Sequence, residues 1–389
     1  MSFRETSGQD VRNKRKLFPF GTALLLIIAG LLGCLAIYNS RAFGNSPMSF
    51  VLRQMLWLGP GVAIFLIAAA VPFNFYRKAA LPLLLLSMGA LTAVLFRGVT
   101  VNGMRGWFDF GAFNLQPSEF AKTFFLLYLC VKCGPEKKTS FGTWLRLLLP
   151  GIVTAGLVMA EPDYGGYVMF FIIFLLVTVL NGSGVHYLLA AAGIMLLATT
   201  YFLSVNDYAM LRIVGFLNPE SVNAWHIRQF QYTMAHGGWT GSDWGNALWS
   251  GSFLPLPHTD SLFASIVEST GFLGGILVIC GFLIMSATFC ALSWKVQGKN
   301  NDRRYFIFLT GAMYLIQALI HISVNCVLIP PTGITLPILS YGGSSLLAVL
   351  LTFGIAFSAS HSDEDSDPGG VPQTAGGEFH TGPAEFLRK

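Results

Sequence analysis

The sequence predicts an all-α, polytopic integral membrane protein with about ten transmembrane helices and one long extracytoplasmic loop between the seventh and eighth helices. Three observations lead to this fold class. Hydrophobic residues make up 53% of the 389 residues and charged residues only 11%, well below the roughly 25% that is usual in soluble domains. Ten apolar stretches approach the roughly 20 residues that a helix needs to cross a bilayer. The charged residues gather between those stretches.

The ten apolar stretches are taken in chain order by their length and their lack of charge. The predicted helices are 17–38, 50–72, 79–96, 117–132, 143–160, 165–181, 184–204, 261–290, 305–329 and 338–359. The first has no small-residue cleavage pattern behind it, so we interpret it as a retained helix and not as a signal peptide. The membrane domain is therefore predicted over 17–359. A basic tail (1–16) precedes it, and an acidic, Gly- and Pro-rich tail (360–389) follows, which we expect to be disordered.

The distribution of basic residues predicts the orientation. Most of the 24 lysines and arginines fall in the tails and in the loops on the side that holds both termini, and this excess is typical of the cytoplasmic side. Because these residues are spread over short loops, the net charge of +5 indicates topology and not a nucleic-acid surface.

The long segment 205–260 is predicted to lie outside the cell. Loops of this length in a compact protein are usually functional or disordered. Its tryptophans argue against disorder, although tryptophan is also common at membrane interfaces for its amphipathic ring alone. The four tryptophans of this segment are Trp225, Trp239, Trp244 and Trp249.

Several classes of function lack sequence support. Cys130 and Cys133 form a C-x-x-C pair without a second pair of zinc ligands, so we interpret the six cysteines as packing residues. The sequence has no Walker loop, no Rossmann glycine fingerprint and no H-E-x-x-H pattern. ATP, NAD and zinc-protease chemistry are therefore not supported.

Polar residues are predicted to converge on the outer side. Glu119 and Lys122 are three residues apart at the start of a helix that opens at Pro117. They either neutralise each other or line a watery cavity, which we favour. Glu161 and Asp163 are expected at the outer surface. The Pro- and Gly-rich stretch 330–345 predicts irregular backbone, which is tolerated where it lines a cavity.

Asp260 stands at the start of the eighth predicted helix, two residues after His258. An aspartate in this position can cap a helix or act as a general base, and the residue chemistry alone leaves both interpretations open. His321 lies within the ninth helix, where we expect a hydrogen-bonded structural histidine. The shared face of these polar groups predicts an extracytoplasmic site.

Four segments carry a resemblance to a known family: "QPSEFAK" (116–122), "PDYGG" (162–166), "HTD" (258–260, with Glu268 and Gly271 after it) and "PPTGITLPILSYGGSS" (330–345). In this order they resemble the signature blocks of the SEDS family (shape, elongation, division, sporulation), which includes RodA and FtsW. The resemblance covers residues 17–359. It implies a peptidoglycan glycosyltransferase that polymerises lipid II into β-1,4 glycan strands at the outer face of the bacterial cytoplasmic membrane.

The resemblance implies that Asp260 is the catalytic carboxylate, which takes a proton from the acceptor hydroxyl. One carboxylate suffices because a diphosphate leaving group needs no acid, in contrast to glycosidases. Cationic side chains are expected to neutralise that diphosphate, directly or around a divalent cation such as Mg²⁺ or Mn²⁺; no other cofactor is expected. The expected substrate-binding residues are Trp107, Arg105, Glu119, Lys122, Asp163, Arg228, His258, Thr259, Ser340, Gly342 and Gly343.

The resemblance also implies partners. A class B penicillin-binding protein would supply the transpeptidase that cross-links the strands, and other membrane proteins of the division or elongation complex are expected around it. The stretch "TGITLP" favours an FtsW-like role.

The chain departs from the family pattern at five places, one of which is Glu268–Ser269 in place of a usual pair of glutamates. Leu256 replaces a usual glutamate, Gly106 separates Arg105 from the tryptophan, and His321 replaces a usual asparagine; the fifth is Ser242, in the glycine-rich block. Two other functions stay open: a lipid II flippase or transporter, and a non-catalytic scaffold of the cell-wall synthesis complex.

Overall fold

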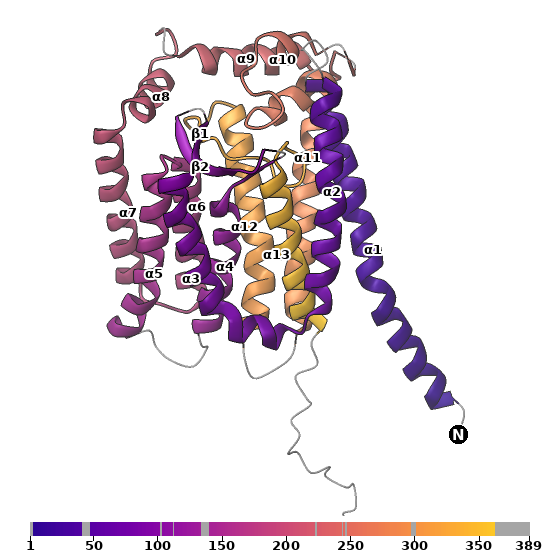
Figure 1. Cartoon of the computed structure of the whole chain (residues 1–389). Coiled ribbons are helices and arrows are strands. Elements are labelled where there is room, and N and C mark those ends of the chain that lie inside the picture. Colours follow the sequence, from indigo (N-terminus) through magenta and orange to yellow (C-terminus); the bar gives the residue numbers. More distant parts are fainter. Residues whose placement is uncertain are drawn as a thin grey trace, which may run out of the picture.

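The structure is a bundle of long helices with a layer of short helices across one end (Figure 1). It is a computed structural model that describes residues 3–40, 47–101, 103–111, 113–133, 140–221, 224–242, 244–245, 247–296 and 301–361. Most of the predicted C-terminal tail, 362–389, lies outside the described residues.

Every one of the ten predicted spans is a helix, and within the described residues eight helices are long and apolar enough to cross a membrane. The exceptions are α4 and α6, with 16 and 17 residues. The chain is therefore a multi-pass membrane protein. The ten helices are α1 (Phe3–Ser40), α2 (Pro47–Ala70), α3 (Phe73–Arg97), α4 (Pro117–Lys132), α5 (Phe141–Ala160), α6 (Tyr164–Leu180), α7 (Val185–Val205), α11 (Leu262–Lys295), α12 (Asp302–Asn325) and α13 (Gly343–His361).

Five predicted boundaries were wrong by four residues or more. Helix α3 begins at Phe73 and not at residue 79, and α11 ends at Lys295 and not at residue 290. Helix α1 begins at Phe3 and not at residue 17, so the basic N-terminal segment is helical. Helix α12 ends at Asn325 and α13 begins only at Gly343. The Pro- and Gly-rich segment between them is therefore longer than predicted. Its apolar residues resemble those of a membrane span, and for this reason they were assigned to the two helices. Its prolines and its left-handed Gly333 (φ 74°) interrupt the helical hydrogen bonding.

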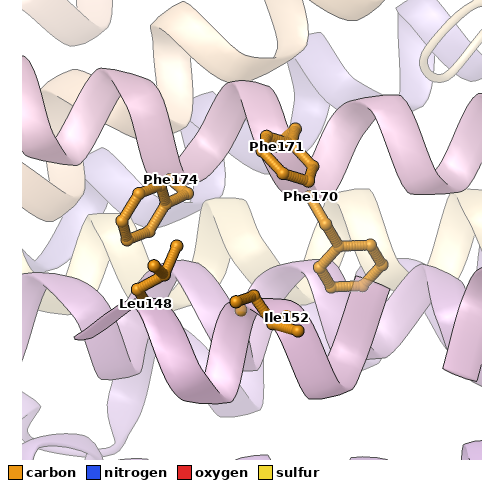
Figure 2. Close-up of a pocket in the computed structure, with 6 residues that line it drawn as sticks. Leu148, Ile152, Phe170, Phe171 and Phe174 are labelled. Carbon is orange, nitrogen blue, oxygen red and sulfur yellow. The ribbon is translucent and has the colours of Figure 1, made fainter. Parts of the chain in front are cut away.

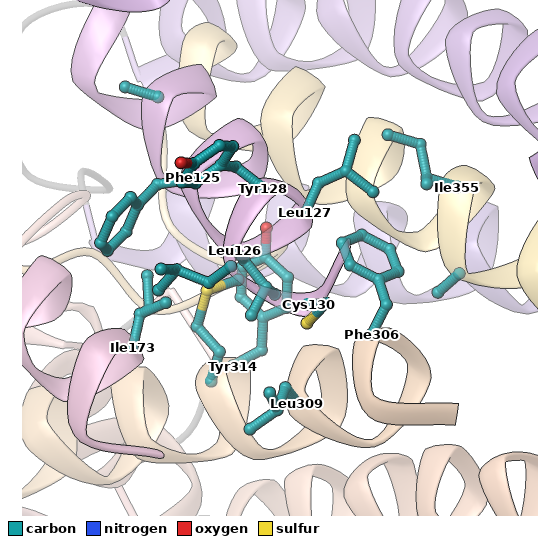
Figure 3. Packing of buried hydrophobic residues seen from close by; sticks show 14 of the residues in the cluster. Phe125, Leu126, Leu127, Tyr128, Cys130, Ile173, Phe306, Leu309, Tyr314 and Ile355 are labelled. Atoms are coloured by element: carbon teal, nitrogen blue, oxygen red, sulfur yellow. The ribbon is translucent and has the colours of Figure 1, made fainter. Parts of the chain in front are cut away.

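Helix α4 forms the centre of the bundle and packs against α3, α6, α12 and α13. Figure 3 shows Phe125, Leu126 and Leu127 of α4 among side chains of α6, α12 and α13. These three side chains are at most 1% exposed. A helix so apolar on all sides is expected only in a bundle core.

The connection between α3 and α4 was not predicted to contain strands. It forms a small antiparallel sheet of β1 (Val99–Val101), β2 (Met104–Asp109) and β3 (Asn114–Leu115), in the order β1-β2-β3. Trp107 on β2 pairs with Val99 on β1. The sheet lies at the same end of the bundle as the short helices (Figure 1).

The segment 205–260 is largely helical. We name the layer of α8 (Asp207–Leu217), α9 (Trp225–Gly237) and α10 (Leu248–Ser252) the cap. Glycines dock the cap on α11 by close backbone contact: a Cβ on Gly237 would lie 2.2 Å from the Val267 carbonyl oxygen, and one on Gly241 2.1 Å from that of Ser269. Only glycine fits such contacts.

A shallow apolar hollow opens between α5 and α6. Figure 2 shows Leu148 and Ile152 of α5 opposite the phenylalanines of α6. Its lining contains no titratable side chain, so the chemistry of the protein lies elsewhere.

Candidate functional site

Asp260 lies in a turn that the segment between α12 and α13 holds in place. The Ser340 hydroxyl donates to the carbonyl of Thr259 at 2.7 Å, and the backbone N–H of Tyr341 donates to the carbonyl of His258 at 2.8 Å. The ring of His258 also packs between Phe50 and Tyr341, with centroids 4.5 and 5.5 Å away. The two residues that precede Asp260 are therefore held in place by contacts with Ser340, Tyr341 and Phe50.

Asp260 does not cap α11. The N-cap residue is Ser261, and no side chain makes the usual cap hydrogen bond there. Two side chains of α12 bind the first N–H groups of α11 instead. Asn325 accepts from Ala264 N–H at 3.0 Å, and His321 accepts from Phe263 N–H at 3.4 Å. The helix-cap interpretation of Asp260 was wrong, and its carboxylate is left available for chemistry.

The same two α12 residues hold the site together. Asn325 donates to the Asp260 carbonyl at 3.0 Å, and His321 hydrogen-bonds the Ile334 carbonyl at 2.8 Å. His321 is 1% exposed, which confirms the structural role predicted for it.

The charge that acts on Asp260 comes from the cap. Burial raises the pKa of Asp260 above its usual value, whereas the positive charge of Arg212 on α8 and a hydrogen bond from the Thr259 hydroxyl lower it. Arg212 was not among the predicted cations. A positive charge that acts on the carboxylate stabilises the ionised form that a general base requires.

A second group of charges surrounds Asp163. The carboxylate of Asp163 caps α6 by accepting from Gly166 N–H at 2.7 Å. Burial chiefly raises its pKa to about 6, and the charges of Lys122, Glu119 and Asp260 act on it as well. Lys122 and Glu119 pair at 2.9 Å with little exposure. The structure thus brings four of the predicted site residues within electrostatic range of one another.

Glu161 was predicted at the outer surface but is fully buried. Its two carboxyl oxygens have no hydrogen-bond donor among the described residues. A Cβ on Gly106 would lie 3.0 Å from one of these oxygens. Burial, and to a lesser extent the charge of Asp163, raise the pKa of Glu161 to about 9, so the group is neutral at pH 7.

We expect Glu161→Gln to stabilise the protein increasingly as the pH rises. The folded protein keeps a proton on Glu161 that the unfolded chain releases, so wild-type stability falls between pH 4.5 and about 9. Glutamine cannot titrate. The difference in thermal transition temperature between variant and wild type should grow across this window and then level off.

Glu220→Gln, at an exposed position of the cap, is the control and should show no such trend. A difference for Glu161→Gln that stays constant with pH would contradict the buried neutral carboxyl.

Two of the cations predicted to bind the diphosphate hydrogen-bond backbone carbonyls in this structure. The guanidinium of Arg105 donates to the carbonyls of Gly98 and Phe96 at 2.9 and 3.3 Å. That of Arg228 donates to the carbonyls of Pro219 and Ser221, both at 3.1 Å. The first side chain binds the backbone around the β-sheet, and the second closes the turn between α8 and α9.

Three other predicted residues lie on β2 and at the start of α13. Trp107 is half-buried on β2. Gly342 N–H donates to the amide of Gln54 at 3.2 Å. A Cβ on Gly343 would lie 2.5 Å from the indole of Trp57, so this glycine permits α2 and α13 to approach.

Glu268 anchors the cap, a role that was not predicted from the sequence. It is fully buried and accepts from the N–H groups of Trp249 and Ser250 at 2.8 Å, from the Ser250 hydroxyl, and from His236 at 2.9 Å. A lone acid inside a predicted membrane span was the signal that marked it. For Arg212 the only signal was a single cation in a short amphipathic stretch.

Together, a membrane-spanning bundle and a cluster of charged residues at one end define a polytopic membrane protein with a polar site at the membrane boundary. The model of the FtsW/RodA/SpoVE family, described as cell cycle protein, matches residues 16–365. The chain belongs to this family.

Relatives and solved structures agree with that assignment. A protein of Pseudoalteromonas translucida, named "Probable peptidoglycan glycosyltransferase FtsW", is 32% identical over 325 residues, 81% of each chain. A Francisella salina protein of the same name is 32% identical over 323 residues, 80% of each chain. These identities extend over the membrane bundle and the cap.

Among solved structures, a chain from a peptidoglycan synthase complex that coordinates polymerization and crosslinking has a TM-score of 0.72 at 26% identity, covering 88% of this chain and 97% of that one. The rod shape determining protein RodA of Thermus thermophilus has a TM-score of 0.65 at 24% identity, covering 88% of this chain and 96% of that one. The latter shows a shared fold.

Proposed function

We propose that the protein is a peptidoglycan glycosyltransferase that polymerises lipid II into β-1,4 glycan strands, with Asp260 as the general base. The names of its relatives support the reaction. The observation that carries the role of Asp260 is its carboxylate: it caps no helix, sits in a turn held by Ser340 and Asn325, and experiences the charge of Arg212.

In this mechanism the acceptor sugar hydroxyl attacks the anomeric carbon of the donor. A new glycosidic C–O bond forms while the bond from the anomeric carbon to the diphosphate oxygen breaks. Asp260 accepts the hydroxyl proton as the bond forms. The lipid diphosphate leaves as an anion and needs no proton.

Arg212 and Lys122 are the cations that we assign to the diphosphate, in place of Arg105 and Arg228. Fixed positive charges that face the developing negative charge lower the barrier. The described residues contain no group of three or more His, Cys, Asp or Glu side chains that could hold a metal ion. The proposed mechanism therefore assigns any divalent cation to the diphosphate of the substrate.

We further propose that this end of the bundle faces outward in the bacterial cytoplasmic membrane, with both termini in the cytoplasm. The excess of basic residues at the opposite end supports this orientation. A class B penicillin-binding protein is the proposed partner, supported by the similarity to a synthase complex that couples polymerization and crosslinking.

A transporter would need a polar path through the bundle. Below Lys122 the core of α4 is apolar, apart from hydroxyl groups, and this favours chemistry at one end over transport. The test is polymerisation of labelled lipid II by purified protein with its partner. Glycan ladders are expected; a well-folded, partner-bound protein without ladders would favour the scaffold or transporter function.

Arg212→Ala should lower kcat about 10²-fold, the usual size for loss of one transition-state contact. It should also move the acid limb of kcat/KM to higher pH, because loss of the positive charge raises the pKa of Asp260, which must be ionised to act. The measurement is the pH profile of lipid II polymerisation.

Arg97→Ala removes an exposed arginine at the end of α3 and serves as the control, with an unchanged profile. If Arg212→Ala lowered the rate but left the acid limb in place, Arg212 would not act on Asp260.

A further inference from the structure

Three buried hydroxyl groups join α4, α12 and α13 beneath the charged residues of the site. The hydroxyl oxygens of Thr123 and Thr352 are 2.6 Å apart, and those of Tyr314 and Thr352 are 3.0 Å apart. Thr123 and Thr352 are fully buried and Tyr314 is 3% exposed. The mechanism proposed above does not use these residues.

The protons of this network can be assigned. The Thr352 hydroxyl donates its only proton to the carbonyl of Ala348 at 2.6 Å. A hydroxyl has two lone pairs, so Thr352 accepts from both Thr123 and Tyr314. Every hydroxyl proton is then used, and a buried polar network that is fully satisfied specifies one arrangement of its helices.

A second tie joins α4 to α13 closer to the site. The Ser344 hydroxyl accepts from Gln116 N–H at 2.9 Å and donates to the carbonyl of Asn114 at 3.2 Å. Ser344 and Thr352 therefore bracket the part of α4 that carries Glu119 and Lys122. By the helical rise of about 1.5 Å per residue, the two ties lie about 12 Å apart along α13.

Helix α13 is also connected to Asp260. The segment that leads into it binds the turn of Asp260 through Ser340 and Tyr341. Helix α13 and the segment directly before it thus contact both halves of the site. If α4 rotated about its own axis by the angle between two successive residues, about 100°, Lys122 would move away from Asp163 and Asp260.

We propose that the network of Thr123, Thr352 and Tyr314 is a positioning device that fixes the rotation of α4 and thereby aligns Lys122 and Glu119 with Asp260. This inference rests on the proposed glycosyltransferase function for its effect on rate, whereas its effect on α4 does not depend on that function.

The decisive variant is Thr352→Val, which keeps the shape of the side chain but removes the acceptor shared by the other two hydroxyls. We expect kcat for lipid II polymerisation to fall about tenfold, with KM within twofold. Thr352→Ser restores the hydroxyl and should return kcat to within twofold of wild type. Thr123→Val removes one donor and leaves the rest satisfied, so its effect should be smaller.

Thr310→Val is the matched control. Thr310 is fully buried on α12, and its hydroxyl donates to the carbonyl of Phe306 of its own helix at 2.8 Å. This variant should keep wild-type kcat. If Thr352 acts through Lys122, the double variant Lys122→Met/Thr352→Val should be no more than about twofold slower than Lys122→Met alone.

Hydrogen exchange of the first turns of α4 provides a readout independent of activity. Exchange in residues 117–123 should be faster in Thr352→Val than in wild type and unchanged in Thr310→Val. Equal exchange of this segment in Thr352→Val and Thr310→Val would overturn the inference. Equal kcat values of these two variants would overturn it as well. An inactive wild type would instead count against the proposed function, and hydrogen exchange would still decide the inference.

Discussion

Asp260→Asn is expected to reduce lipid II polymerisation by about 10²- to 10⁴-fold, the range that loss of a general base usually produces. Asparagine has the same shape but cannot accept the proton of the acceptor hydroxyl. The Asp260 carbonyl keeps its bond from Asn325, so the turn should stay in place. Glycan ladders from purified protein with its partner measure the effect.

The wild-type pH profile gives a second readout of the same group. Since burial raises the pKa of Asp260, the acid limb of kcat/KM should lie above the usual range of an aspartate. Activity then increases as the pH rises through this pKa, because the ionised form is the base.

Folding and partner binding of Asp260→Asn should match the wild type, and its thermal stability should be equal or higher because a desolvated charge is removed. Asp109→Asn, at an exposed position of β2, is the control with full activity. Retention of activity within tenfold in Asp260→Asn would show that another group removes the proton.

Glu268→Ala is expected to undock the cap and lower polymerisation at least tenfold. The substitution leaves the N–H groups of Trp249 and Ser250 and the side chain of His236 without their acceptor. Loss of one partner from a buried charged cluster costs about 3–5 kcal/mol, which exceeds what a short helix such as α10 can compensate. Arg212, carried by the same cap, would then lose its position relative to Asp260.

Limited proteolysis provides the direct measurement. Residues 236–253 should become accessible in Glu268→Ala, while the membrane bundle stays resistant. Glu220→Ala, an exposed acid of the same cap, should behave as wild type. A Glu268→Ala protein with resistant cap and activity within twofold would mean that the glycine contacts of Gly237 and Gly241 hold the cap alone.

The positions of the membrane spans could be predicted because the bilayer imposes them locally. A run of apolar residues must cross the hydrocarbon core as a helix, since only a helix satisfies its own backbone there. The existence of α7 or α11 therefore follows from composition alone. The end of α12 and the start of α13 do not follow from composition. The apolar residues between these helices pack against α1, α2 and α11 without forming a helix.

The sequence also determined which polar groups share one end of the bundle. Alternating spans place Glu119, Asp163 and Asp260 on the same side of the membrane, whatever the packing. Only the tertiary structure decided which side chains interact with Asp260, because these residues are distant from it in the chain. The charge of Arg212, which the cap carries, acts on Asp260, whereas the side chains of Arg105 and Arg228 bind backbone carbonyls close to them in the chain.

The same distinction explains Glu161 and Glu268. Both are acids beside or within apolar segments, and composition shows no difference between them. One is buried against Gly106 without a donor and is neutral, whereas the other collects four donors from the cap. The sequence by itself determined the fold class and the grouping of the polar residues at one end of the bundle. The tertiary structure decided the charge and the role of each acid, because desolvation and hydrogen bonding depend on the groups that packing brings together.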